Sequence, residues 1–441
     1  MIRMSGVFGS AYVTVDDAEA ACKKQIAGFL NHPAFTNEIV IMPDTHAGKG
    51  SVIGFTMPIV PDRIIPNVIG VDIGCGMLAL NTGKHDLGIA PEQLDSRIRK
   101  SVPFGKSVHA NAVDMSASPW ERANMLATNF AAAYMKRFGI TLNPPLYNEE
   151  WFSKKCRDIG IDEQRVVKSI GTLGGGNHFI EFGRSSETDE IWLVIHTGSR
   201  GFGAKIAEYW QSVATDVVRP RRAETLRRRI AEIRTSTKGE EIALQIKDAG
   251  NSLGLAKGVN DDPAMDWLDG KEAFGYLFDM IFAQVYAEYN RHTIARIIMN
   301  IVGCGEVDKI ETVHNFIDFH DFITRKGAIR SYAGERMIIP FNMRDGILIC
   351  EGKSNAEWNC SAPHGAGRLM SRGDAMKTLD MKKFEQQMNE AGIFSTSVCP
   401  STLDESAEAY KPGEFIERAI EPTAKIVDRL RPIHNLKDLN K

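Results

Sequence analysis

Residues 70–77 read Gly-Val-Asp-Ile-Gly-Cys-Gly-Met, which sets the carboxylate of Asp72 and the thiol of Cys75 three positions apart among three glycines. The apolar stretch 68–71 predicts a short buried strand that breaks into a tight turn here. A thiolate can bridge two cations, and a carboxylate beside it adds a hard oxygen ligand that suits manganese or zinc. Taken alone, this pair is also typical of a turn aspartate beside a buried cysteine. The metal interpretation therefore depends on partners elsewhere in the chain.

Histidines at other predicted strand ends supply such partners. His178, His196 and His314 each stand beside glycine or asparagine in polar turns, and His364 lies in a turn of small residues that leaves room for a substrate. One thiol, three imidazoles and a carboxylate are enough ligands for a dinuclear site with a bridging thiolate. The sequence thus predicts a metal-dependent enzyme.

Basic residues stand close to the same motifs. Four of them would complement phosphate groups: Arg200, Lys326, Arg368 and Arg372. The glycine-rich loop 171–176 by itself is a weak phosphate signal, because it lacks both the P-loop lysine and the dinucleotide-binding spacing. The expected chemistry is therefore phosphoryl transfer supported by metals and by cationic side chains.

The composition is that of an ordinary globular protein. The 441 residues are 43% hydrophobic and 25% charged, and the net charge of −3 gives no overall attraction to nucleic acid. Seven irregularly spaced cysteines and a start without an apolar signal core predict a cytoplasmic protein with reduced thiols. No apolar run approaches the length of a membrane span, and we expect a monomer.

The chain alternates strand-like and helix-like patterns. Residues 39–42 and 191–195 predict buried strands, and residues 271–300 predict a long helix. Residues 415–430 also predict a helix. The arginine-rich segment 219–262 predicts an inserted helical arm, which is either a solvated helical face or a surface that contacts RNA.

The motifs, taken in order, resemble those of the RtcB-type RNA ligases. The resemblance covers almost the whole chain and includes MPDTHAGKG (42–50), GVDIGCGM (70–77), GTLGGGNHFIE (171–181), HTGSRGFG (196–203), HN (314–315), TRKGA (324–328), SAPHGAGRLMSR (361–372) and DESAEAYK (404–411). It implies an α+β fold: a single RtcB-like domain over residues 1–441 with packed β-sheets surrounded by helices, and with residues 219–262 as a helical insertion.

The resemblance also implies a reaction. A histidine attacks the α-phosphate of GTP to form histidine-GMP and pyrophosphate, and the guanylyl group passes to an RNA 3′-phosphate, which can arise by opening of a 2′,3′-cyclic phosphate. A 5′-hydroxyl then displaces GMP and seals the strand, in RNA repair or tRNA splicing. His364 matches the nucleophile. Asp72, Cys75 and His178 would hold one Mn²⁺, and Cys75, His196 and His314 the other.

Further positions match family contacts to the nucleotide and RNA. The nucleotide set is Asn177, Glu181, His314, Asn315, Asn342, Met343, His364, Ala366, Gly367, Tyr410 and Lys437. By similarity, Glu181 would accept hydrogen bonds from guanine N–H groups. Arg200, Lys326, Arg368 and Arg372 would hold phosphates of nucleotide or RNA.

One segment departs from the family pattern. The family usually has Pro-Gly-Ser-Met-Gly followed by small residues and serine, whereas residues 340–347 read Pro-Phe-Asn-Met-Arg-Asp-Gly-Ile. Phe341, Arg344 and Asp345 are bulky or charged replacements in a wall that closes over the guanosine, and Ile347 replaces a hydroxyl. The chain therefore looks like a divergent paralogue.

Three functions follow from these patterns. The first is a GTP- and Mn²⁺-dependent ligase that joins RNA 3′-phosphate or 2′,3′-cyclic phosphate ends to 5′-hydroxyl ends. The second, motivated by the altered segment 341–347, is a phosphodiesterase that opens cyclic phosphates or a nucleotidyltransferase with another nucleotide choice. The third is a non-enzymatic RNA-end binder, for which the full ligand set would have no use.

Overall fold

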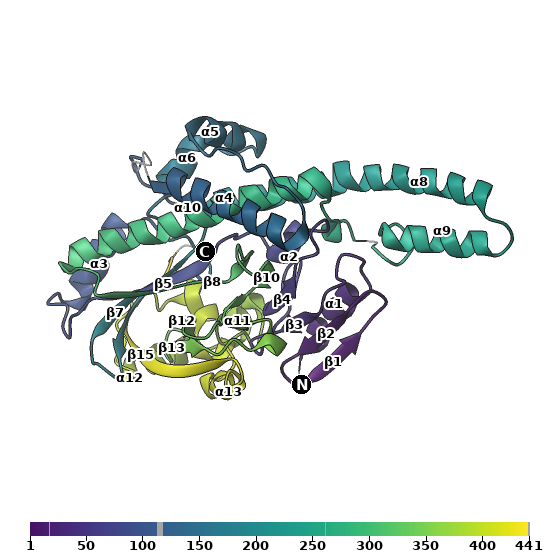
Figure 1. Ribbon diagram of the computed structural model, residues 1–441. Coiled ribbons are helices and arrows are strands. Elements are labelled where there is room, and N and C mark those ends of the chain that lie inside the picture. The colour runs from purple at the N-terminus through teal and green to yellow at the C-terminus, as the bar shows by residue number, and fades with distance from the viewer. Residues whose placement is uncertain (17, 113–117, 261, 440–441) are drawn as a thin grey trace.

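The computed structural model describes residues 1–16, 18–112, 118–260 and 262–439. Within these residues the fold is mixed α+β, with two main sheets under a layer of helices (Figure 1). The predicted α+β class is confirmed.

Within the described residues, seven strands form the larger sheet. In spatial order they are β12 (Arg336–Pro340), β13 (Ile347–Gly352), β15 (Ala424–Leu436), β6 (Phe179–Ser185), β7 (Ile191–Thr197), β5 (Gly76–Asn81) and β8 (Asp308–Val313), and neighbouring strands are antiparallel. The sheet curls, and Arg336 at the start of β12 forms an ion pair with Asp308 of β8 with 2.6 Å between Nη1 and Oδ2. The two outer strands therefore meet.

The second sheet contains six of the described strands. Their order is β1 (Ile2–Ser5), β2 (Ser10–Val13), β3 (Ile39–Ile41), β4 (Phe55–Pro58), β10 (Ile323–Lys326) and β9 (Asn315–Ile317). A separate antiparallel pair joins β11 (Ala328–Arg330) to β14 (Ser361–Pro363). The strands predicted at 39–42 and 191–195 are confirmed as β3 and β7.

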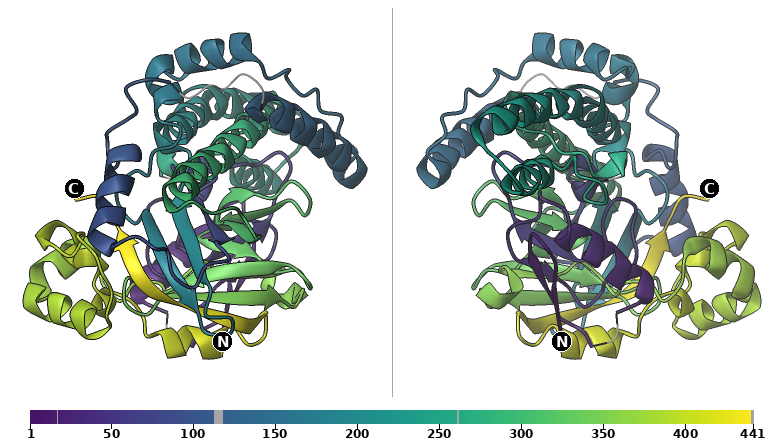
Figure 2. Two further views of the ribbon diagram at one scale, coloured as in Figure 1. Left: turned by 90° about the vertical axis from the view of Figure 1, so that its left-hand side faces the viewer. Right: turned by 90° about the vertical axis from the view of Figure 1, so that its right-hand side faces the viewer.

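The helices lie around the two sheets, and only part of them covers the outer face of the larger sheet. They are α1 (Ala20–Leu30), α2 (Pro66–Ile69), α3 (Pro91–Ser101), α4 (Ser118–Phe138), α5 (Glu149–Asp158), α6 (Glu163–Lys168), α7 (Arg200–Val213), α8 (Arg219–Ser236), α9 (Glu241–Ser252), α10 (Gly270–Val302), α11 (Arg372–Thr378), α12 (Met381–Glu390) and α13 (Gly413–Ala419), with a π-helical turn at Ala214–Val218 between α7 and α8. The long α10, predicted at 271–300, crosses this face (Figures 1 and 2). No helix among the described residues is long and apolar enough to cross a membrane.

Strand alternation explains how α10 is fixed over the sheet. Leu78 of β5 and Leu193 of β7 pack with Ile294 and Ile298 of α10, whereas Met77, the neighbour of Leu78, packs on the opposite face within the curl. Successive side chains of a strand point to opposite faces, so both faces of these strands are buried. The core thus holds α10 rigidly above strands β5 and β7.

Two predicted elements are wrong. The stretch 68–71 is not a strand. Pro66 suits the first turn of a helix, and α2 spans Pro66–Ile69; Val71, after its end, is exposed. The helix predicted at 415–430 is also wrong, since α13 ends at Ala419 and β15 begins at Ala424. Pro422 stands between them, and β15 pairs along both sides with β13 and β6.

The segment 219–262 contains the helices α8 and α9, which lie side by side and project from the body (Figure 1). At the base, Arg219 donates to the buried Asp266 at 2.7 Å, Arg221 pairs with Asp269 and Glu272, and the buried Arg222 stacks on Trp267. These arginines attach the arm to the body, so at the base the segment is neither a solvated helical face nor a surface free to contact RNA. That the segment is an insertion relative to its family stays a prediction.

Candidate metal centre and nucleotide cavity

The register of four neighbouring strands brings the predicted ligands to one edge of the sheet. Gly76 at the start of β5 pairs with Thr197 of β7 and with Val313 of β8, and Phe179 at the start of β6 pairs with His196. Cys75, His178 and His314 directly adjoin these paired positions in sequence. Residues from distant parts of the chain therefore meet because β6, β7, β5 and β8 are adjacent.

The ligand atoms form two groups that share Cys75. In the first, His178 Nε2 lies 3.0 Å from Asp72 Oδ2 and 3.5 Å from Cys75 Sγ. In the second, His196 Nε2 lies 3.3 Å from both Cys75 Sγ and His314 Nε2. Both groups match the two sets implied by the resemblance.

Glycines allow the turn that carries Asp72 and Cys75 to approach its neighbours. A Cβ on Gly198 would lie 2.1 Å from Asp72 Oδ1, so a side chain there would displace the carboxylate. Gly74 has φ +74° and lies directly against α10, where a Cβ would come within 2.8 Å of the Gln284 Cα. The absence of a side chain at Gly74 and at Gly198 thus lets the turn pack closely against its neighbours.

The donor set fits a divalent cation. The Nδ1 of His196 contacts the carbonyl of Asn177 at 3.2 Å, which assigns the proton to Nδ1 and leaves the Nε2 lone pair directed at the cluster. Burial lowers the pKa of His196 and of His314 well below the usual range, so both imidazoles are neutral as metal ligation requires. One thiol sulfur, neutral imidazole nitrogens and a carboxylate suit borderline metals such as manganese or zinc.

The pKa values of the two acidic ligands, Asp72 and Cys75, are shifted in opposite directions. Burial alone would raise the pKa of Asp72, but the hydrogen bond and charge of His178 lower it to about 2. Burial and the nearby Asp72 raise the pKa of the Cys75 thiol well above its usual value. A bound cation would reverse this preference, because a coordinated thiol loses its proton.

His364 lies beside the cluster in the turn that follows β14. Its ring centroid is 4.9 Å from that of His314, and its Nδ1 lies 2.7 Å from Oδ2 of the fully buried Asp44. Since a carboxylate accepts, Nδ1 donates its proton to Asp44 and Nε2 keeps a free lone pair. This is how an imidazole nucleophile is oriented.

A cavity of about 220 Å³ opens next to His364. Of the predicted nucleotide residues, those on its wall are Asn177, Glu181, Asn342, Met343, His364, Ala366, Gly367, Tyr410 and Lys437. His314 and Asn315 lie instead at the metal cluster, where the Asn315 side chain donates to the Asp72 carbonyl at 3.4 Å. The structure thus brings most of the predicted nucleotide set around one cavity.

Two buried acceptors line this cavity. Asn435 Nδ2 donates to Glu181 Oε2 at 2.7 Å, which leaves Asn435 Oδ1 and Glu181 Oε1 without protein partners. The two residues pair across β15 and β6, and both are at most 2% exposed. Burial raises the pKa of Glu181 to about 8, although Asn435 and Lys437 act in the opposite direction. Unpartnered buried acceptors need a ligand that donates.

The four predicted phosphate-binding cations divide into two pairs. Arg368 and Arg372 line the cavity; Arg368 donates to the Tyr410 hydroxyl at 3.0 Å, and Arg372 Nη1 lies 2.6 Å from Asp404 Oδ2. Arg200 instead donates to Thr172 and to the Gly105 carbonyl.

Lys326 is buried beneath Gly70, where a Cβ would lie 1.8 Å from its Nζ. Burial lowers the pKa of Lys326 to about 8, whereas Asp72 and Cys75 act to raise it. Arg200 and Lys326 therefore lie against the loops that carry the candidate metal ligands, and their binding of phosphate stays a prediction.

The altered segment 340–347 forms part of the cavity wall. Phe341 and Ile347 are buried and line it. The charged residues satisfy each other: Arg344 Nε donates to Asp345 at 2.7 Å, and both backbone N–H groups donate to Asn342 Oδ1. The substitutions make the wall more apolar without placing an unpaired charge in it.

Asp44 and Asn435 were not predicted as site residues. Asp44 lies in the motif 42–50. Its position just after a buried strand is the one sequence feature that could have indicated a site residue. Asn435 lies beyond the helix predicted at 415–430, and only the pairing of β15 with β6 brings it to Glu181.

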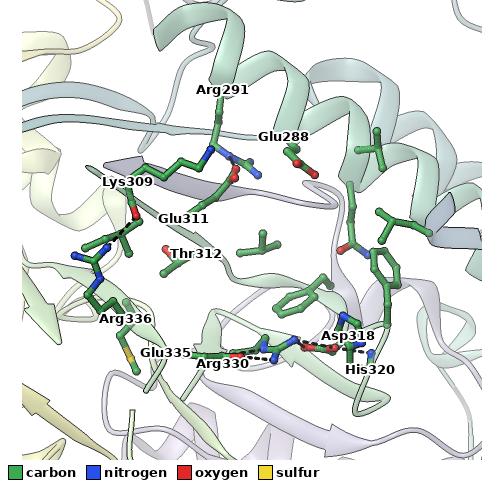
Figure 3. Close-up of a pocket in the computed structure, with 18 of the residues that line it drawn as sticks. Glu288, Arg291, Lys309, Glu311, Thr312, Asp318, His320, Arg330, Glu335 and Arg336 are labelled. Carbon is green, nitrogen blue, oxygen red and sulfur yellow. Dashed lines mark hydrogen bonds and ion pairs between the residues drawn. The ribbon is translucent and has the colours of Figure 1, made fainter. Parts of the chain in front are cut away.

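A second cavity of about 540 Å³ lies between α10 and β8 (Figure 3). Glu288 and Glu311 line it, and together with His292 they form a third candidate ligand group. However, Glu288 has Arg122 at 3.5 Å and Glu311 has Arg291 at 2.8 Å. Because each carboxylate already faces a cation, we treat this group as an ion-pair network.

Together these features define an α+β protein with a candidate dinuclear metal centre, an oriented histidine and a cavity with buried hydrogen-bond acceptors beside it. A profile of the family described as tRNA-splicing ligase RtcB matches residues 25–438, so the chain belongs to the RtcB family. The RNA-splicing ligase RtcB of Escherichia coli K12 is 28% identical over 94% of this chain and 93% of that protein. The tRNA-splicing ligase RtcB of Pyrobaculum aerophilum is 28% identical over 89% of this chain and 86% of that protein.

Proposed function

We propose that the protein is a GTP- and Mn²⁺-dependent ligase that joins RNA 3′-phosphate or 2′,3′-cyclic phosphate ends to 5′-hydroxyl ends, in RNA repair or tRNA splicing. Membership of the RtcB family supports the RNA substrate, and relatives are named as RNA-splicing ligases. The observation that carries the chemistry is the position of His364, which is oriented by Asp44 and lies between the ligand clusters and the cavity.

In the first step, His364 Nε2 attacks the α-phosphorus of GTP. A P–N bond forms, the bond to the bridging α–β oxygen breaks, and pyrophosphate leaves. The Nδ1 proton stays on the ring and is shared with Asp44, which stabilises the positive charge of the phosphorylated imidazole. Asp44 thus acts as the orienting partner of the nucleophile.

In the later steps, an oxygen of the RNA 3′-phosphate attacks the same phosphorus and releases His364 from the guanylate. The 5′-hydroxyl then attacks the activated 3′-phosphate and loses its proton to water, a new phosphodiester forms, and the bond to GMP breaks. Arg368 and Arg372, on the cavity wall, supply positive charge for the phosphates that enter. Arg372 pairs with the carboxylates of Asp404 and Glu405, whereas Arg368 donates to the Asp404 backbone carbonyl and lies 3.8 Å from Glu405; an entering phosphate would compete for these contacts.

Two Mn²⁺ ions would be held by Asp72, Cys75 and His178 and by Cys75, His196 and His314. When bound, the ions supply charge neutralisation at the reacting phosphate and at the leaving group. The neutral imidazoles and the shared cysteine supply the ligand types that such a site needs.

The cavity acceptors support guanine as the base. Guanine presents two adjacent kinds of N–H donor on its Watson–Crick edge, N1–H and the N2 amino group. Glu181 Oε1 and Asn435 Oδ1 are the unpartnered acceptors that such donors would satisfy. Adenine presents an unprotonated N1 instead, which would leave one acceptor unpaired. Phe341 and Ile347 provide apolar surface for the base.

The test is RNA joining with defined ends. We expect the wild-type protein, with Mn²⁺ and GTP, to join a 3′-phosphate or cyclic-phosphate RNA to a 5′-hydroxyl RNA, and His364→Ala to join none. His85→Ala changes an exposed histidine and is the matched control that keeps activity. Joining that persists in His364→Ala contradicts the proposal. Opening of the cyclic phosphate without joining would favour the phosphodiesterase alternative that the altered segment 341–347 suggests.

A further inference from the structure

Two consecutive buried residues of α10, Asn290 and Arg291, face the backbone segments that carry the metal ligands. Their side chains are 0% and 1% exposed. Buried polar side chains need specific hydrogen-bond partners. Their partners come from three segments that are far apart in sequence: the turn at residues 70–77, the glycine loop 171–176, and the end of β7.

Arg291 joins the backbones next to two ligands. Its Nη1 donates to the Gly74 carbonyl at 2.8 Å and to the Thr197 carbonyl at 3.1 Å. Gly74 directly precedes Cys75, the ligand shared by both clusters, and Thr197 directly follows His196. One planar guanidinium therefore fixes the backbone of the shared thiol relative to that of a histidine ligand.

Asn290 binds the backbone of the glycine loop and of Gly198. Its Oδ1 accepts from the N–H groups of Gly171 and Thr172, and its Nδ2 donates to the carbonyls of Thr172 and Gly198, all between 2.8 and 3.2 Å. The glycine loop leads directly to His178. α10 thus contacts the approaches to three of the predicted ligands.

Glu311 holds Arg291 from the opposite direction, and Figure 3 shows the two side chains at the wall of the larger cavity. Glu311 Oε1 accepts from Arg291 Nε at 2.8 Å, and Oε2 lies 3.1 Å from His292 Nε2. Although burial opposes it, Arg291 and His292 lower the pKa of Glu311 to about 2. The carboxylate is therefore ionised at neutral pH and gives Arg291 a fixed ionic partner.

We propose that Arg291, held by Glu311, is the positioning residue of the metal centre and sets the separation of Cys75 and His196 before a cation binds. This inference rests on the proposed function, because it takes these side chains to be metal ligands. Arg291 touches neither the metal nor the substrate; it acts through the Gly74 and Thr197 carbonyls. Outer residues that orient ligands typically change metal affinity 10- to 100-fold when they are substituted.

The geometry requires arginine at this position. The three acceptors, two carbonyls and one carboxylate, are reached from two different nitrogens of one rigid group. A lysine side chain is one bond shorter, so its ammonium reaches the position of the Arg291 Cζ and stops short of Nη1, the atom that donates to both carbonyls. Arg291→Lys therefore keeps the buried positive charge opposite Glu311 while it removes the link between the two carbonyls.

The test is a cobalt(II) titration of the purified full-length protein, followed by thiolate-to-cobalt charge-transfer absorption. This absorption reports a cation bound to Cys75 and does not depend on catalysis. We expect Arg291→Lys to bind cobalt about 10- to 100-fold more weakly than wild type. Arg222→Lys, which changes another buried arginine that contacts Asp266 and Trp267, is the matched control and should bind as wild type does. Thermal unfolding of each protein without metal accompanies the titration.

The outcomes are distinct. Equal cobalt affinity in Arg291→Lys and wild type would overturn the positioning role while the metal centre stands. Equal weakening in Arg222→Lys would also overturn it, since the effect would then be general destabilisation. A wild-type protein without the charge-transfer band would overturn the metal centre of the proposed function and this inference with it. If Arg291→Lys does not fold, Glu311→Gln, which keeps the arginine but removes its ionic partner, is expected to weaken cobalt binding in the same direction.

Discussion

At the scale of single residues, one hydrogen bond decides which nitrogen of His364 is available for chemistry. The Nδ1 proton is donated to Asp44 at 2.7 Å, so Nε2 is the free nitrogen. Asp44→Asn removes the negative charge and allows an amide N–H to face the ring, which favours the wrong tautomer. We predict that the rate of histidine guanylylation falls by about 10²- to 10⁴-fold. A single-turnover label-transfer assay at saturating GTP measures it, and a rate within about threefold of wild type would contradict the role of Asp44.

Glu181 gives nucleotide binding a pH dependence. Its pKa is raised to about 8, so in the empty cavity the carboxyl is mainly protonated at neutral pH and ionises as the pH rises through about 8. Only the ionised form leaves Glu181 Oε1 free of a proton to accept a guanine N–H, while Asn435 Oδ1 accepts the other, so binding of guanine releases a proton. We predict that the affinity of metal-free protein for GMP increases from about pH 7 to about pH 8.5. Calorimetric titration tests this, with Glu181→Gln as the control whose affinity should not follow pH; parallel curves for both proteins would refute the assignment.

At the scale of secondary-structure elements, the arm formed by α8 and α9 divides into a base and a tip. Arg219, Arg221 and Arg222 fix the base to the body, whereas Arg228 and Arg229 are exposed further along α8. Since the contacts with the body are made by the base, the tip should be dispensable for chemistry on the nucleotide.

We therefore predict that replacing residues 227–248 with a short glycine turn leaves both the unfolding midpoint and guanylylation of His364 close to those of wild type. RNA-joining rates measured on the same variant show whether the tip contacts RNA. A loss of guanylylation in the folded variant would contradict the division into base and tip.

Elements with strong local patterns could be predicted, and elements set by tertiary pairing could not. α10 carries apolar residues along its whole length, and β7 is a continuous apolar run. β15, in contrast, contains charged residues and Pro432, and its strand form depends on partners on both sides, with a register shift between Pro432 and His434. Pairing of this kind overrides local propensity.

At the scale of the whole molecule, the site is assembled from strand ends and loops that only the fold brings together. The ligand residues could be named from their spacing, because thiol, imidazole and carboxylate in glycine-flanked turns are unusual in combination. Arg291 could not be named, since an arginine within a largely apolar helix shows no partner in the sequence. The same holds for Asn435, whose partner Glu181 lies 254 positions away.

The metal centre should also contribute to the stability of the whole protein. Its ligands come from four different segments, and an unfolded chain cannot present them together. A cation that binds only the folded state at 100 times its dissociation constant raises the free energy of unfolding by about 2.7 kcal/mol. We predict that Mn²⁺ raises the thermal midpoint, that a chelator reverses the shift, and that His196→Ala removes most of it. An unchanged midpoint in wild type would argue against metal binding at these residues.

The measurement that tests the central claim most directly is covalent labelling of the protein by α-labelled GTP or ATP with Mn²⁺, resolved on a denaturing gel. The account predicts label from GTP on wild type, little label from ATP, and none on His364→Ala. Peptide mapping should place the guanylate on His364. The absence of label from any nucleotide in folded, metal-loaded protein, or label that persists in His364→Ala, would contradict the proposed mechanism.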